Sequence, residues 1–114
     1  MQINKKYYEK VPPVREPRPS SLITSIECSY SKLTDILGEP TYRHRDDYKV
    51  DAEWVLYNGE NKITVYNYKD GKNYLGEEGF ETEDITDWHI GGSDKHVSEH
   101  FKRNLEEELR LYDV

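Results

Sequence analysis

The strongest constraint on the fold is a pair of alternating segments on either side of an Asn-Gly turn. Residues 51–57 and 62–68 are rich in aromatic and β-branched side chains, and apolar and polar positions alternate along both. Asn58 and Gly59, which lie between them, are the preferred residues of a tight hairpin turn. The two segments therefore predict an antiparallel hairpin, around which the other elements must be arranged.

Two further segments are predicted to be strands. Residues 22–28 and 84–90 both combine β-branched, apolar and aromatic side chains over a short run. Gly91 and Gly92 are expected to end the second strand, because glycine has low strand propensity. Residues 41–49 are polar and charged, and we expect a loop there.

Two segments show the spacing of an amphipathic helix. Residues 32–37 follow Ser29 and Ser31, either of which can cap a helix, and they place three apolar side chains on one stripe. A longer helix is expected to begin after Ser93 or Asp94. Its apolar residues form a single narrow stripe and run to the expected end of the helix: Val97, Phe101, Leu105, Leu109 and Tyr112.

These elements predict one α+β domain over residues 21–114. We expect a small antiparallel sheet of three to four strands, with the C-terminal helix and the short N-terminal helix packed on it. Hydrophobic residues make up only 34% of the chain, so its ten Tyr and two Trp must supply much of the core. Residues 1–20 hold four of the five prolines and a net charge of +3, which predicts a basic arm that is extended or disordered.

The charge distribution limits the classes of partner. The chain carries a net charge of −7, and residues 77–114 alone carry −8. Such a chain is a poor direct binder of nucleic acid, since counterion release needs clustered Lys and Arg. No apolar run is long enough to span a bilayer or act as a secretion signal, and the single cysteine, Cys28, has no internal disulfide partner.

No motif for catalysis stands out in the sequence. There is no P-loop, no G-x-G-x-x-G and no serine nucleophile motif. His96 and His100 share a helix face, but the run H-V-S-E-H lacks the zincin order of ligands. We therefore expect a non-enzymatic protein with no catalytic residues, no metal and no cofactor.

Aromatic and acidic residues gather in the second half of the chain and form the first candidate site. Aromatic side chains with a polar tip serve equally as core residues and as protein-binding surfaces, so both interpretations stay open. Acidic residues beside them would face a basic groove on a partner. The predicted partner-binding residues are Tyr68, Tyr74, Glu77, Glu78, Glu83, Asp84, Asp87 and Trp88.

The glycine-rich stretch 69–79 offers an alternative site. Its backbone amides, together with Lys69, Lys72 and Asn73, could hold the phosphate of a nucleotide while nearby aromatic rings stack on the base. The simpler interpretation of this stretch is an ordinary long connection within the sheet.

Three blocks of the chain carry a resemblance to a known group. They are DAEWVL at 51–56, VYNYKDGKNYLGEEG at 65–79 and ITDWHIGG at 85–92. With them, residues 29–92 resemble a group of small proteins encoded by tailed bacteriophages. The resemblance brings no chemistry with it, because the group has no established common activity.

The resemblance implies a small accessory phage protein that acts in the cytoplasm of the infected bacterial host. Many such proteins inhibit host defence, including CRISPR effectors, so by analogy we expect this chain to bind and inhibit a bacterial defence protein with a basic surface, such as a CRISPR-associated nuclease. One alternative is a sponge for a signalling nucleotide. Another is a virion or assembly component that works as a homo-oligomer and uses its proline arm to clasp a neighbour.

Overall fold

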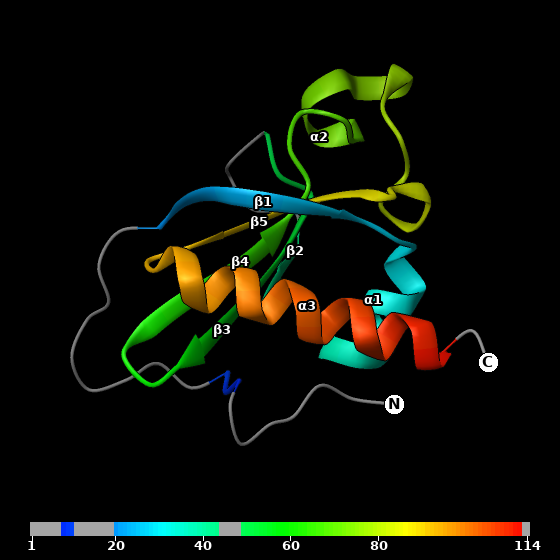
Figure 1. Cartoon of the computed structure of the whole chain (residues 1–114). Helices are drawn as coiled ribbons and strands as arrows, with labels where there is room; N and C mark the ends of the chain where they lie inside the picture. Colours follow the sequence, from blue (N-terminus) through cyan, green and yellow to red (C-terminus); the bar gives the residue numbers. More distant parts are fainter. Residues whose placement is uncertain (1–7, 11–19, 44–48, 113–114) are drawn as a thin grey trace.

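A five-stranded antiparallel sheet organises the protein in the computed structural model, which describes residues 8–10, 20–43 and 49–112 (Figure 1). Its strand order is β1-β5-β4-β3-β2. The α+β class is confirmed, but the sheet has five strands and not three to four. The additional strand is the two-residue β2, which lies in the predicted loop and pairs with β3. The strands are β1 (Ser21–Glu27), β2 (Tyr42–Arg43), β3 (Ala52–Asn58), β4 (Asn61–Tyr66) and β5 (Asp87–Gly92).

The hairpin predicted around the Asn-Gly turn is formed by β3 and β4. In its register, Trp54 lies opposite Val65 and Leu56 lies opposite Ile63. Gly59 has a φ of 59°, a left-handed conformation that glycine adopts without steric cost. The hairpin prediction is therefore confirmed, and these four side chains belong to the core.

Two helices pack on the same face of the sheet, α1 (Tyr30–Leu37) and α3 (Lys95–Tyr112) (Figure 1). Of the two serines that could cap α1, Ser29 does so: its Oγ accepts a hydrogen bond from the Lys32 backbone N–H at 3.3 Å. At α3, the Asp94 carboxylate accepts from the Val97 N–H at 3.0 Å. No helix in the described part of the chain is long and apolar enough to cross a membrane.

The core is centred on two tryptophans. Trp54 and Trp88 are both fully buried, and their rings meet edge to face with centroids 5.3 Å apart. Each indole N–H has a carbonyl acceptor: Trp54 donates to Gly38 and Trp88 to Cys28. Aromatic rings thus fill the volume that a richer aliphatic content would fill elsewhere, and they do so without an unsatisfied N–H.

β5 differs from the predicted strand at both ends. It starts at Asp87, and it continues through Gly91 and Gly92, which were expected to end it. A Cβ at Gly92 would lie 2.1 Å from the Ser98 Oγ, and one at Gly91 would lie 2.8 Å from the Ser21 carbonyl oxygen. Only glycine lets α3 and β1 approach the strand this closely, so the two glycines belong to the packed sheet.

Part of the predicted N-terminal arm belongs to the folded structure. Tyr8 is buried, and its ring packs edge to face on Phe101 of α3. Glu9 exchanges two backbone hydrogen bonds with Tyr57, at 2.8 and 2.7 Å, and so extends the sheet beside β3. The proline-containing stretch 11–19 lies outside the described residues.

The connection between β4 and β5 contains three short helical turns instead of a plain loop. They are α2 (Lys72–Leu75), η1 (Gly76–Glu78) and η2 (Thr82–Asp84). Figure 1 shows α2 and η1 projecting beyond the end of the sheet. We call this connection, residues 67–86, the excursion. It carries most of the residues that were predicted to bind a partner.

Candidate functional site

A buried carboxylate fixes the start of the excursion. Asp51 is only 2% exposed, and its two oxygens accept hydrogen bonds from the Asn67 side-chain amide at 2.8 Å and the Asn73 backbone N–H at 3.1 Å. A Cβ on Gly71 would lie 2.1 Å from the Asp51 Oδ1, so the carboxylate fills the space that any larger residue at 71 would need. The position of α2 therefore depends on a residue at the beginning of β3.

The side chain of Asn67 completes this anchor. It is fully buried, and its carbonyl oxygen accepts from the backbone N–H groups of Asp51 and Ala52 at 2.7 and 3.1 Å. Its amide also donates to Asp70 at 3.1 Å. The Asn67 side chain therefore makes the hydrogen bonds that backbone groups make elsewhere in the sheet. It connects the end of β4 to the start of β3 and to the turn at Asp70, beyond the last regular pair of the two strands.

The far end of the excursion returns to its own start. Phe80 donates its N–H to the Asp70 carbonyl oxygen and accepts from the Lys72 N–H, at 3.0 and 3.2 Å. Gly79 lies against Gly71 so closely that a Cβ on it would sit 2.3 Å from the Gly71 carbonyl oxygen. Residues 67–80 are thus a closed, internally bonded unit, and the glycine spacing of the sequence serves this closure.

An aromatic row runs from the sheet onto this unit. On the helix-free face, Tyr66 of β4 meets His89 of β5 edge to face, with ring centroids 5.6 Å apart, and the Tyr68 ring stacks on His89 at 5.7 Å. Lys69 has a φ of 62°, unusual for a residue with a Cβ, and places its ammonium 5.2 and 5.5 Å from the rings of Tyr68 and Tyr74. Burial raises the pKa of Tyr66, and the nearby Glu53 carboxylate adds to the shift.

The excursion exposes an unusual amount of apolar surface. Seven large hydrophobic side chains are exposed in the described part of the chain, and four of them lie between residues 68 and 80. Exposed apolar groups concentrated on one rigid segment mark an interaction surface more often than a stability element. We call these four residues the apolar patch: Tyr68, Tyr74, Leu75 and Phe80.

Acidic residues follow the apolar patch in the chain and separate its last member, Phe80, from Leu75. Residues 77–84 contain five carboxylates and no basic side chain. Glu83 forms an ion pair with Arg43 at 3.4 Å, and Glu81 forms one with Lys72 at 3.0 Å. We call the five residues the acidic rim: Glu77, Glu78, Glu81, Glu83 and Asp84.

Six of the eight predicted partner-binding residues lie on the excursion, and one of the other two needs a correction. Trp88 is fully buried with its N–H bonded to Cys28, so it is a core residue and not a surface contact. Asp87 is exposed at the start of β5, outside the excursion. Sequence reasoning missed Leu75 and Phe80, although two large apolar residues inside a glycine- and charge-rich stretch were a usable signal.

The residues of the alternative phosphate site are engaged in other contacts. Lys72 pairs with Glu81, and Lys69 lies over the two tyrosine rings. The Asn73 side chain donates to the Val50 carbonyl oxygen at 3.0 Å, and its backbone N–H is bonded to Asp51. Asn73 therefore holds the excursion in place, and each of the two lysines contacts different partners.

Cys28 is the one thiol of the chain and lies against the core. Burial raises its pKa to about 12, and the Lys32 ammonium offsets only part of this rise. At neutral pH the group is a protonated thiol, and reactivity at cysteine belongs to the thiolate.

Comparison with protein families, with curated proteins and with solved structures finds no match to this chain. The class of molecule is therefore defined by its geometry alone. It is an α+β domain whose single sheet carries helices on one face and, at one end, a rigid excursion with an apolar patch and an acidic rim.

Proposed function

We propose that this protein binds another protein through the excursion and that the apolar patch forms the centre of the interface. The observation that carries the proposal is the exposure of four large apolar side chains on a segment that buried hydrogen bonds hold rigid. A preformed surface loses little conformational entropy on binding, so apolar contact translates efficiently into affinity.

The acidic rim indicates the chemistry of the partner. Five carboxylates on eight residues favour a basic surface, and charge of this kind speeds encounter and selects partners more than it adds to final affinity. Basic grooves are typical of nucleic-acid-binding proteins, so the proposed partner is such a protein, whose groove the excursion blocks.

The phage resemblance supplies the biological setting of the proposal. Since many phage accessory proteins inhibit host defence, the proposed partner is a bacterial defence component, and by analogy a CRISPR-associated nuclease. In this proposal the chain acts by occupying a surface and performs no catalysis.

The test begins with affinity capture from a bacterial lysate, with the bound proteins identified by mass spectrometry. Binding of a captured nuclease is then measured with wild type and with a Glu77→Lys/Glu78→Lys variant, whose two side chains lie on η1 in the acidic rim. We expect at least about a tenfold rise in Kd, mostly through slower association, and a weaker dependence on salt. Added nucleic acid should displace the protein from the nuclease.

The matched control is Glu60→Lys/Glu107→Lys, which changes the net charge equally at two exposed sites outside the excursion. If both variants lost the same amount of affinity, the effect would come from net charge alone, which would contradict a specific acidic interface. A Leu75→Ala/Phe80→Ala variant that binds as tightly as wild type would contradict the role of the apolar patch. If no protein is captured and a signalling nucleotide raises the melting temperature, the nucleotide sponge replaces this proposal.

A further inference from the structure

The two edges of the sheet differ in whether another segment of the chain covers them. On the β3 side, β2 pairs with the start of the strand, the Thr41 hydroxyl accepts from the Val55 N–H at 2.9 Å, and Glu9 pairs with Tyr57. On the β1 side, no strand among residues 8–10, 20–43 and 49–112 pairs with the outer edge. Proteins normally protect such edges, because unpaired backbone groups attract another strand.

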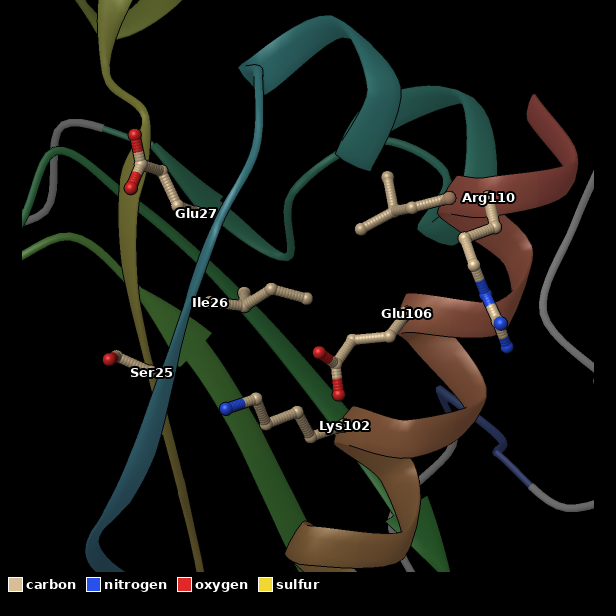
Figure 2. A pocket seen from close by; sticks show the side chains of 7 residues that line it. Ser25, Ile26, Glu27, Lys102, Glu106 and Arg110 are labelled. Atoms are coloured by element: carbon tan, nitrogen blue, oxygen red, sulfur yellow. The ribbon is translucent and has the colours of Figure 1, made fainter. Parts of the chain in front are cut away.

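The unpaired groups of β1 can be identified from the ladder. Cys28 donates its N–H to the Thr86 carbonyl oxygen at 2.9 Å, and hydrogen bonding alternates along an antiparallel strand. Ile26 therefore bonds to β5, whereas the N–H and C=O of Ser25 and Glu27 point outward. Figure 2 agrees: the Ile26 side chain points toward α3, and those of Ser25 and Glu27 point away from it.

A groove runs beside this edge, between β1 and α3 (Figure 2). Its volume is about 630 Å³, enough to take several side chains of an added strand. Ile26 and Leu109 supply its apolar surface, and Lys102, Glu106 and Arg110 line it from the helix. The groove therefore offers backbone hydrogen bonds on one side and side-chain contacts on the other, the arrangement used for strand addition.

The charge of the groove indicates what occupies it. The chain carries −7 overall, so its copies repel each other over most of their surface. The groove itself is neutral, with two basic residues against Glu27 and Glu106. A second copy that docks in this groove therefore meets no net charge.

The helix side of the groove is also self-complementary. Lys102, Glu106 and Arg110 are spaced by four residues, so they form a row of alternating sign along α3. When two such rows run antiparallel with an offset of one turn, Lys102 of each copy faces Glu106 of the other. Because the two copies are related by a twofold axis, the two Lys102–Glu106 ion pairs form together.

We propose that two copies of this chain associate by antiparallel pairing of β1 with β1 across a twofold axis. The two five-stranded sheets become one continuous sheet, and the α3 helices lie side by side over the joint. The proposal concerns the edge opposite β3 and does not depend on the function of the excursion.

The first test is the mass in solution, measured by sedimentation equilibrium over a range of concentrations. We expect wild type to shift from the 13.5 kDa chain mass to twice that value as concentration rises. Glu106→Lys makes the row uniformly positive and should raise the dimer Kd by at least about tenfold. Adding Lys102→Glu to that variant restores opposite charges and should restore the dimer.

The matched control is Glu60→Lys, the same charge change at an exposed position in the turn between β3 and β4, outside the groove lining. It should leave the dimer intact. Circular dichroism and thermal melting of all variants separate loss of pairing from loss of folding. If the folded Glu106→Lys variant dimerised with the Kd of wild type, the proposal would be overturned, since the dimer would then form through another face.

Amide hydrogen exchange identifies the occupant of the edge. In the proposed dimer, the amides of Ser25 and Glu27 become protected as the concentration rises, while that of Ile26, bonded to β5, is protected throughout. A monomer in which Ser25 and Glu27 are already protected would assign the edge to another segment of the same chain. A monomer in which both exchange freely would leave it open to a foreign strand. Either result overturns the proposal.

Discussion

At the scale of single residues, two buried polar side chains decide where the excursion lies. Asn67 and Asp51 are 16 positions apart, yet two hydrogen bonds join them, and a third joins the Asn67 side chain to the backbone N–H of Ala52. The pair holds the strand ends and α2 through polar contacts in a place where apolar packing is sparse. Such networks specify one geometry, because each buried group left without a partner is costly.

Replacing Asn67 by Ala is expected to destabilise the protein by about 2–4 kcal/mol, since two buried backbone N–H groups and one carboxylate oxygen lose their partner. The free energy of unfolding is measured by urea denaturation. The control is Asn61→Ala, a half-buried amide at the start of β4, which should cost less than about 1 kcal/mol. Similar losses in the two variants would contradict the special role of Asn67.

The Asp70 carboxyl is expected to make stability depend on pH. Burial raises its pKa above the ordinary value of 3.8, and the Asp87 and Asp51 carboxylates add to the rise while the hydrogen bond from Asn67 opposes it. The folded state therefore binds the proton more tightly than the unfolded state, so this group favours folding at low pH and loses that contribution as the pH rises through the folded pKa.

Asp70→Asn should accordingly raise the urea midpoint at pH 7, where the wild-type carboxylate is charged. The advantage of the variant should shrink as the pH falls through the folded pKa of Asp70 toward 3.8. Urea titrations at a series of pH values measure both effects. An advantage that is constant with pH would show that the carboxyl charge is not its cause.

At the scale of elements, the junction of β5 with α3 depends on close backbone approach. The Ser98 hydroxyl of α3 donates to the Gly91 carbonyl oxygen at 3.1 Å, and it occupies the space where a side chain at 92 would begin. The helix can lie this near the strand only because Gly92 lacks a Cβ.

Gly92→Ala is expected to cost about 1–3 kcal/mol, because the new methyl group meets the Ser98 Oγ and the Lys62 carbonyl oxygen. Combining it with Ser98→Ala removes the first of these clashes. The double variant should therefore lose less stability than the sum of the single variants, as measured by denaturant unfolding. Strict additivity would contradict the contact between strand and helix.

Most elements were accessible from sequence at this scale, and the candidate site was accessible only in part. The hairpin, β1 and both helices follow from patterns within a few residues of each other, such as the Asn-Gly turn and the capping side chains. The acids and tyrosines of the excursion were identified by their clustering. Trp88 was included among the partner-binding residues, but it is buried in the core. Alternation along one strand does not say which face of the sheet the helices cover.

At the scale of the whole molecule, the N-terminal residues 8–10 cover the edge of the sheet beside β3. Tyr8 packs on Phe101, and its hydroxyl accepts a hydrogen bond from the Asn104 amide at 2.7 Å. Residues near opposite ends of the chain therefore share one core.

Tyr8→Ala should destabilise the protein by about 2–4 kcal/mol, in the range of large-to-small substitutions of buried aromatic residues. Tyr74→Ala is the matched control, because that ring is 41% exposed on the excursion, and it should cost less than about 1 kcal/mol. Thermal or urea unfolding measures both. An equally small effect at Tyr8 would show that the N-terminal segment contributes little to the core.

The sequence alone determined the local elements of this protein, since turns, caps and helical stripes are interactions among neighbouring residues. Tertiary structure alone decided which aromatic rings are core, why β5 runs through two glycines, and how Asp51 and Asn67 set the excursion that carries the apolar patch. The reason is physical: these outcomes depend on contacts between residues far apart in the chain, and only the packed sheet and its helices bring such residues together.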